Sequence, residues 1–339
     1  MSYGTLSVSL TNKCNLRCRM CGSQNMENAP PTKFMDFSTW KNIIAKLPET
    51  WMLEINACGE HTLHPQFIEF IKHFAKEKTG RNTIKLSTNG MWNWSNDESF
   101  EFIEILKSLY CATTSKFLPG EADHPQLFFS IDGGEAETVE WIRRGSNYNK
   151  IINNVRRVIQ QADHQVKVNI AYCVMKRNLH EAIPLLKTLP GVNGIYLNLL
   201  TVTTDEMIDE SIYDCQQEYL DAAEKVRVYC KQNSIVISYF HPAANSLIGD
   251  SRGCNYPCYQ WIDTDGIVYP CCRRWDRPIG NINNLEWHEL VSKGRQMLRT
   301  LLREPQCDLC FKLDSGWSWK KHFASREWFD KYLNRGFLK

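Results

Sequence analysis

The chain has 339 residues, 43% of them hydrophobic, which is enough to form cores in roughly two domains of about 150 residues each. The 40 Lys and Arg residues nearly balance the 38 Asp and Glu residues, and this net charge of +2 argues against a nucleic-acid partner. The sequence lacks the run of about 18 apolar residues that predicts a membrane helix. Residues 1–13 lack a signal peptide's apolar segment, so we expect a cytoplasmic protein with reduced thiols.

Short apolar runs alternate with longer segments of helical periodicity along the first 240 residues. Strands are predicted at Leu6–Leu10, Met52–Ala57, Thr83–Ser87, Leu127–Ile131, Val166–Val174 and Gly194–Leu200. Helices are predicted at Ser38–Leu47, Gln66–Lys76, Ser99–Leu109, Glu135–Gln161, His180–Leu186 and Asp214–Asn233. Six strand–helix repeats predict an α/β fold with a parallel sheet. Periodicity alone leaves a partly closed barrel and an open doubly wound sheet as alternatives.

The composition changes near residue 240, where we place a domain boundary. Residues 1–240 form the repeating domain, and residues 241–339 form a smaller one. After a short strand at Ile235–Tyr239, the chain becomes rich in Gly, Pro, Cys and aromatic residues. A helix at Leu285–Leu302 and an aromatic-rich tail at Trp317–Phe337 complete the second domain.

Three cysteines follow the first predicted strand with the spacing C-x3-C-x2-C. They are Cys14, Cys18 and Cys21. Thiolates bind iron–sulfur clusters or zinc, and a [4Fe–4S] cube normally takes four Cys ligands, one for each iron. Three ligands leave one iron free to bind a substrate or cofactor. The alternative is a zinc site that takes His61 or His64 as its fourth ligand.

This triplet, on the loop after the first strand of a six-unit β/α domain, resembles the radical S-adenosylmethionine (SAM) superfamily. The resemblance implies a partial (β/α)6 TIM-like barrel and a [4Fe–4S] cluster held by the three cysteines. It also implies that SAM chelates the fourth iron and that reductive cleavage of SAM yields a 5′-deoxyadenosyl radical, which abstracts a hydrogen atom from the substrate. One difference is Met20, where the family often has an aromatic residue.

Further motifs of the family follow successive strands in the expected order. Gly59 and Glu60 match the Gly-Gly-Glu motif whose Glu helps to bind the amino group of SAM, although Cys58 replaces the first Gly. Cys58 is a candidate hydrogen-atom donor, but a small buried residue is the favoured interpretation. Ser87 and Asn89 belong to a Ser-Thr-Asn-Gly sequence after the third strand. By resemblance, all of these residues lie at the SAM site.

The fourth predicted strand ends in a Ser-Ile-Asp-Gly sequence that begins at Ser130, and Arg143-Arg144-Gly145 is expected in the following helix. In the family, the corresponding Ser and Arg contact the SAM carboxylate. Strand ends are where β/α proteins build their sites, so the order of these motifs strengthens the resemblance.

Six cysteines in the last third of the chain resemble the auxiliary-cluster extension of radical SAM enzymes, called SPASM in its long form and twitch in its short form. An Asp-Gly turn at 265–266 predicts a hairpin between the first four of them. A final C-x2-C follows, and with no Cys beyond it, the twitch form with one auxiliary cluster, expected to be [4Fe–4S], fits better than a full SPASM domain. The resemblance assigns as ligands Cys254, Cys271, Cys307 and Cys310, with Cys258 and Cys272 as alternates. A zinc ribbon is the competing interpretation.

The resemblance implies an oxidoreductase or epimerase that takes electrons from a flavodoxin or ferredoxin. Because only thirteen residues precede Cys14, a small-molecule substrate such as a sugar, aminocyclitol or nucleoside is favoured over a peptide. A peptide- or protein-modifying maturase is the first alternative. The second is a non-catalytic protein that binds an iron–sulfur cluster or zinc.

Overall fold

The computed structural model describes residues 4–24, 31–48, 51–56, 58–78, 82–110, 124–200, 202, 205–239, 259–270 and 277–301. Within these residues, seven parallel strands lie side by side in the order β1-β3-β4-β5-β7-β8-β9. Neighbours in the sheet are therefore also neighbours along the chain, as in a barrel, whereas a doubly wound sheet reverses its order partway. The partial barrel is confirmed.

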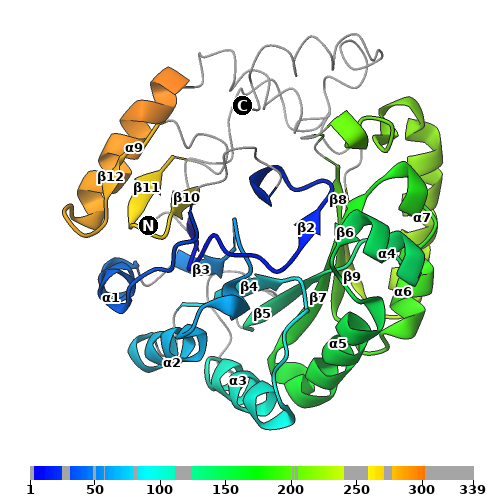
Figure 1. Cartoon of the computed structure of the whole chain (residues 1–339), viewed down its shortest axis with the longest axis horizontal. Helices are drawn as coiled ribbons and strands as arrows, with labels where there is room; N and C mark the ends of the chain where they lie inside the picture. Colours follow the sequence, from blue (N-terminus) through cyan, green and yellow to red (C-terminus); the bar gives the residue numbers. More distant parts are fainter. Residues whose placement is uncertain are drawn as a thin grey trace.

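Apart from the helix over 135–161, the strands and helices predicted for the barrel are present, with small shifts at their ends. The parallel strands are β1 (Gly4–Val8), β3 (Trp51–Ile55), β4 (Ile84–Thr88), β5 (Gln126–Ser130), β7 (Lys167–Val174), β8 (Gly194–Leu199) and β9 (Val236–Tyr239). The helices between them are α1 (Phe37–Lys46), α2 (Phe67–Glu77), α3 (Asn96–Ser108), α4 (Ala136–Ile142), α5 (Tyr148–Ala162), α6 (Ala182–Thr188) and α7 (Gln216–Gln232). Figure 1 shows these helices around the outside of the curved sheet.

The core lies between the sheet and its helices. Alternate strand residues such as Leu6, Val8 and Leu53 pack against helix residues such as Trp40 and Phe70, and all of them are buried. The intervening residues point to the inner side of the sheet, because successive side chains of a strand face opposite ways. The barrel interior is therefore separate from this core.

The predicted helix over 135–161 is wrong at its centre, where the chain forms two helices joined by a short strand. Helix α4 ends at Ile142, β6 (Arg143–Arg144) follows, and α5 begins after its N-cap, Asn147. Gly145 has φ +88°, a conformation that favours glycine and interrupts a helix. Residues 143 and 144 therefore lie on a strand and not within a helix.

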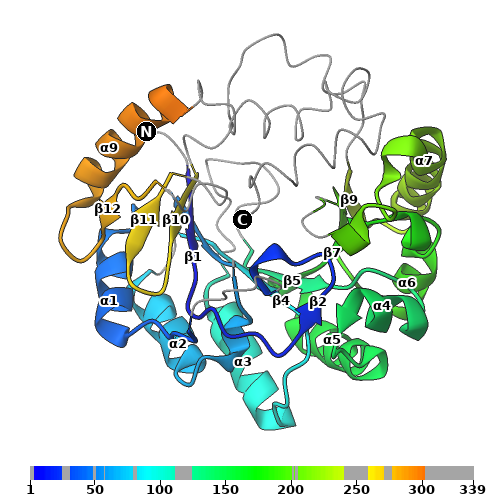
Figure 2. The same ribbon diagram turned by 45° about the horizontal axis from the view of Figure 1, so that its top comes forward.

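A hairpin from the C-terminal part of the chain extends the barrel sheet. Strand β10 (Tyr259–Ile262) pairs in parallel with β1, and β11 (Ile267–Tyr269) and β12 (Gly280–Asn281) follow it in antiparallel order. Gly266, in the predicted turn, has φ +78°. Helix α9 (Trp287–Leu301) lies beside this end of the sheet (Figure 2). Trp287 packs edge-on against Trp51 of β3.

Within the described ranges, the helices are all too short or too polar to span a membrane. The predicted loop at 113–126 lies mostly outside the described residues, as does the tail at 317–337.

Candidate active site

The three N-terminal cysteines lie on one loop after β1. Cys18 belongs to the two-residue strand β2 (Arg17–Cys18), and Cys21 directly precedes the short helix η1 (Gly22–Gln24). The Cys21 amide donates to the carbonyl oxygen of Cys18 at 3.0 Å, which folds the loop into a tight turn. Among the described residues, Cys14, Cys18 and Cys21 form no disulfide bond. We call residues 14–21 the cysteine loop.

Hydrogen-bond donors from three parts of the chain approach the sulfurs of this loop. The Leu16 amide lies 3.4 Å from Cys14 Sγ, and Asn89 Nδ2 lies 3.9 Å from the same sulfur. Arg143 Nη1 lies 3.9 Å from Cys18 Sγ. Such donors stabilise negative charge on sulfur, which is how a protein tunes an iron–sulfur cluster.

Burial raises the pKa of the Cys14 thiol, and it raises that of Cys18 to about 11. The Arg143 guanidinium opposes the rise at Cys18, whereas the neighbouring Cys21 and Cys14 add to it. Thiols so close together cannot all ionise unless a positive centre compensates, and metal ligation requires the thiolate form. The residues therefore fit a metal cluster bound by the loop.

The three cysteines suit a [4Fe–4S] cube, in which each Cys binds a different iron. In the part of the chain that the structure describes, no group of three His, Cys, Asp or Glu side chains forms a site for a single metal ion. His64 is also engaged elsewhere, since its Nε2 lies 2.9 Å from the Met35 carbonyl and its Nδ1 accepts from the Gln66 amide.

Arg143 anchors the loop from the opposite strand. Strands β2 and β6 pair with Cys18 opposite Arg143, although these residues are far apart in the sequence. Arg143 Nη2 lies 2.7 Å from Asp132 Oδ2, and the Asp132 side chain is fully buried. Burial disfavours the charge of Arg143, but the Asp132 carboxylate together with Cys18 and Cys173 outweighs this effect and raises the Arg143 pKa. A fixed guanidinium charge therefore lies beside Cys18.

The Gly59-Glu60 segment packs directly under the cysteine loop. A Cβ atom on Gly59 would lie 2.3 Å from the carbonyl oxygen of Thr11 and 2.7 Å from that of Lys13, so only glycine fits. The Glu60 amide donates to the Lys13 carbonyl at 2.8 Å. Cys58, the candidate hydrogen-atom donor, is half-buried just before this contact.

Glu60 is buried and tied to the end of β4. Its Oε1 accepts from the hydroxyls of Thr62 and Thr88 at 2.7 and 2.8 Å, and its Oε2 accepts from the Asn89 amide at 2.7 Å. Burial raises the pKa of Glu60, and these hydrogen bonds oppose the rise. Asn89 Nδ2 also donates to Asn15 Oδ1 at 2.8 Å, so Glu60 and Asn89 join two strand ends to the cysteine loop.

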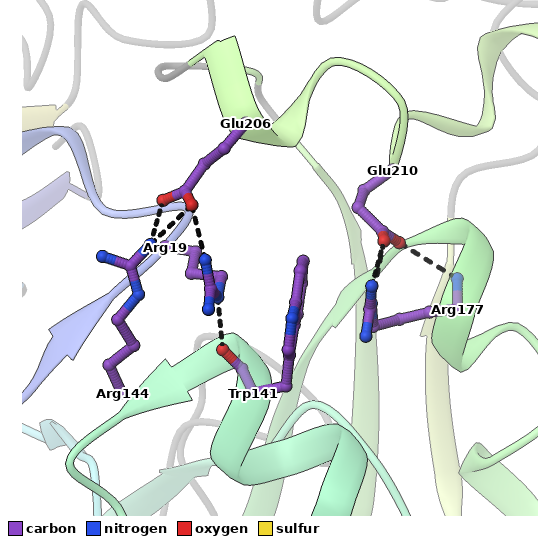
Figure 3. A network of polar contacts seen from close by, with 6 residues as sticks. All are labelled: Arg19, Trp141, Arg144, Arg177, Glu206 and Glu210. Carbon is purple, nitrogen blue, oxygen red and sulfur yellow. Dashed lines mark hydrogen bonds and ion pairs between the residues drawn. The ribbon is translucent and has the colours of Figure 1, made fainter.

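The other predicted SAM contacts occupy different positions around this loop. Ser87 lies on β4 and Ser130 is the last residue of β5, so both lie near the carboxyl ends of parallel strands. Arg144 turns away from Asp132, and its Nη2 contacts Glu206 at 2.5 and 2.6 Å (Figure 3). Glu206 has no motif around it, and its contact partners are distant in sequence, so sequence reasoning missed it.

The predicted ligands of the second cluster are outside the described residues. They are Cys254, Cys271, Cys307 and Cys310, with the alternates Cys258 and Cys272.

Residues 8–188, more than half of the chain, match the radical SAM superfamily, and with the cysteine loop at the end of the first barrel strand they show that the chain belongs to it. Membership implies SAM and a [4Fe–4S] cluster, together with a reductant that supplies electrons. When bound, SAM and the cluster supply a 5′-deoxyadenosyl radical. Cys14, Cys18 and Cys21 would hold the cluster.

Two named proteins are similar to this chain in sequence over most of their length. The tungsten-containing aldehyde ferredoxin oxidoreductase cofactor-modifying protein of Pyrococcus furiosus is 26% identical over 277 residues, which cover 79% of this chain and 70% of that protein. GTP 3′,8-cyclase of Limosilactobacillus fermentum is 22% identical over 267 residues, which cover 78% of this chain and 70% of that protein.

Two solved structures share the fold. Hexahistidine-tagged anSMEcpe with bound AdoMet superposes with a TM-score of 0.69 at 16% identity, over 99% of this chain and 94% of that chain. Streptococcus suis SuiB bound to precursor peptide SuiA gives a TM-score of 0.63 at 13% identity, over 85% of this chain and 64% of that chain. At these identities the likeness concerns the fold alone.

Proposed function

We propose that this radical SAM enzyme abstracts a hydrogen atom from a small polar molecule, a sugar, aminocyclitol or nucleoside-like compound, and catalyses a dehydrogenation or an epimerisation. The observation that carries the radical chemistry is the cysteine loop, with Arg143, Glu60 and Asn89 packed against it at the carboxyl ends of the strands. A flavodoxin or ferredoxin is the proposed electron donor.

The polar inner side of the barrel supports a polar substrate. Ser7, Glu54 and Lys85 lie in register on β1, β3 and β4, on the side of the sheet opposite the apolar core. Lys85 Nζ contacts Glu54 Oε1 at 2.7 Å, and Lys85 lies 4.7 Å from the ring centroid of Phe128. Glu54 Oε2 and Ser7 Oγ are buried and have no hydrogen-bond partner among the described residues. Such groups hydrogen-bond to hydroxyl and amino groups.

Roles at the site follow from the same contacts. We propose that Ser130 and one of the two arginines, Arg143 or Arg144, bind the SAM carboxylate, and that Glu60 and Asn89 orient the amino end. Gly59 lets this segment approach the loop. Cys58 is proposed as a hydrogen-atom donor only if the reaction is an epimerisation.

The test uses anaerobically purified, reconstituted protein. With dithionite and SAM we expect 5′-deoxyadenosine, and we expect Cys18→Ala to abolish it because one of three cluster ligands is lost. Adding sugars, aminocyclitols or nucleosides should increase 5′-deoxyadenosine formation by the wild-type protein. Stimulation by peptides alone would replace the small-molecule proposal with a maturase. Zinc in place of iron, with no SAM cleavage, would overturn the enzymatic proposal.

A further inference from the structure

A cluster of charged side chains links the segment after β8 to the cysteine loop. Glu206 lies in the short helix η5 (Asp205–Met207) and bridges two arginines (Figure 3). Its Oε2 lies 2.5 Å from Arg19 Nη1, and its two oxygens lie 2.6 and 2.5 Å from Arg144 Nη2. Arg19 directly follows Cys18, and Arg144 pairs with Arg17 in the β2–β6 ladder. One carboxylate therefore contacts the residue that follows Cys18 and a residue of the strand that pairs with β2.

Trp141, in α4, completes the fixation of Arg19. The Arg19 guanidinium lies 4.3 Å from the centroid of the Trp141 ring, and Arg19 Nε donates to the Trp141 carbonyl at 2.9 Å. The Arg19 amide also donates to the Ile142 carbonyl at 2.9 Å. Stacking and hydrogen bonding together hold this guanidinium in one place, where it donates to Glu206.

Apolar contacts reinforce the same link. Buried Ile142, Met175, Leu200, Val202 and Met207 form a small cluster apart from the main core, and Met20 packs against it. Met207 adjoins Glu206, and Met20 lies between Arg19 and Cys21 in the cysteine loop. The described residues that follow β8 therefore contact the loop through the carboxylate of Glu206 and through this apolar cluster.

We propose that Glu206 is a positioning residue for the SAM-binding cluster, an inference that rests on the proposed function. Glu206 fixes Arg19 and Arg144 on either side of Cys18 and offsets their positive charge. The side chains of Arg19, Glu206 and Arg144 keep 24%, 35% and 42% exposure, so the pairs are only partly screened by water. Without the carboxylate, the positive charge of two guanidinium groups beside the cluster is no longer offset by Glu206, and the loop loses its anchor to η5.

The chain provides a matched control in Glu210. Its carboxylate accepts from Arg177 Nε at 2.8 Å, and Arg177 stacks on Trp141 at 3.2 Å from the ring centroid. Figure 3 shows Trp141 between Arg19 and Arg177, so Glu210 stands on the far side of the ring from Glu206. Glu206→Gln and Glu210→Gln each remove one negative charge from the same group of residues, but only Glu206 reaches the cysteine loop.

The experiment compares the two reconstituted variants with the wild-type protein at equal iron content. For Glu206→Gln we expect the affinity for SAM to fall at least about fivefold, the lower end of the effects usual when a change at one site alters binding at another. We also expect a higher reduction potential of the cluster, because loss of a nearby negative charge favours the more negative reduced state. The electron paramagnetic resonance spectrum of the reduced cluster with SAM should change as well. Glu210→Gln should resemble the wild-type protein in all three.

Equal SAM affinity, potential and spectrum in the two variants would overturn the positioning role of Glu206. If Glu206→Gln fails to take up iron, Arg19→Lys replaces it, and this variant should show the same change in SAM affinity and spectrum, because lysine cannot donate to Glu206 and to the Trp141 carbonyl while stacking on the Trp141 ring. An unaltered Arg19→Lys would also overturn the inference. Failure of the proposed function is distinguishable, since the wild-type protein itself would then not bind SAM or form 5′-deoxyadenosine.

Discussion

Residue 59 can carry no side chain, because the backbone of residues 11–13, which lead into the cysteine loop, occupies the space. We predict that Gly59→Ala prevents cluster assembly, since a Cβ atom 2.3 Å from the Thr11 carbonyl must push the loop out of place. The clashing atom belongs to the backbone and not to the end of a flexible side chain, so the steric clash cannot be relieved by a small local shift. Iron content after reconstitution measures the effect.

Cys58→Ala is the control for this substitution. It changes the neighbouring residue, keeps a small side chain, and should leave iron content and SAM cleavage at the wild-type level. Normal iron content in Gly59→Ala would show that the loop can shift without losing its ligands. Loss of product but not of 5′-deoxyadenosine in Cys58→Ala would support the hydrogen-donor role.

His61 makes the stability of the fold depend on pH. Its side chain is 2% exposed and its Nδ1 accepts from the Leu10 amide at 3.3 Å. Burial lowers the His61 pKa from 6.5 to about 4. The unfolded chain therefore binds a proton more readily, and the stability that neutral His61 contributes is complete above pH 6.5 and is lost as the pH falls toward 4.

From about pH 7 to about pH 5.5, we predict a loss of about 1 kcal/mol in the free energy of unfolding from His61 alone. The pKa of His64 is also lowered, so it adds a loss of the same sign. Denaturant titrations at both pH values measure this loss in the wild-type protein and in His61→Gln. The difference between the two losses is the contribution of His61 to the free energy of unfolding. Equal pH dependence in the two proteins would show that His61 is not the titrating group.

At the scale of elements, the barrel was predictable because its strands and helices carry strong local patterns. Val166–Val174 and β7 nearly coincide, since alternating burial and β-branched residues define that strand without reference to its neighbours. Helix α5 has its buried Ile151, Val155 and Val158 at helical spacing. The turn at Asp265-Gly266 was also predictable, because its residue types favour a turn whatever the rest of the fold.

The β2–β6 ladder was not predictable, because two residues of pairing leave no periodic pattern. Its partners, Cys18 and Arg143, are separated by 125 residues, and only the fold brings them together. The break in the helix predicted over 135–161 has a visible cause in Gly145, but a glycine within a helical pattern is often tolerated.

The three cysteines of the candidate site were recognisable from their spacing, and the Gly-Glu motif from its resemblance to the family. The contacts that hold them were not. Glu206 and Arg19 are 187 residues apart, and neither stands in a sequence pattern that requires the other. Spacing therefore predicts the ligands of a cluster better than the side chains that position it.

At the scale of the whole molecule, the C-terminal part is attached to the barrel at the strand that leads into the cysteine loop. The Ser9 amide donates to the Ile262 carbonyl at 2.9 Å, and Trp261 Nε1 donates to Ser9 Oγ at 3.3 Å. Cys258 directly precedes β10 in the sequence, and Cys271 follows β11 by two residues. If these regions hold a second cluster, the hairpin anchors it to β1, which favours electron transfer between the barrel and the C-terminal part.

This arrangement leads to a prediction for Cys307→Ala. The wild-type protein should bind about eight irons per chain, whereas the variant should bind about four, because only the second cluster loses a ligand. The variant should still form 5′-deoxyadenosine from SAM. If the reaction is a dehydrogenation, it should yield no product, since the electron from the substrate radical has no acceptor. Cys215→Ala, in a half-buried cysteine just before α7, is the matched control and should keep all the iron. Full product formation by Cys307→Ala would contradict an electron-transfer role for the second cluster.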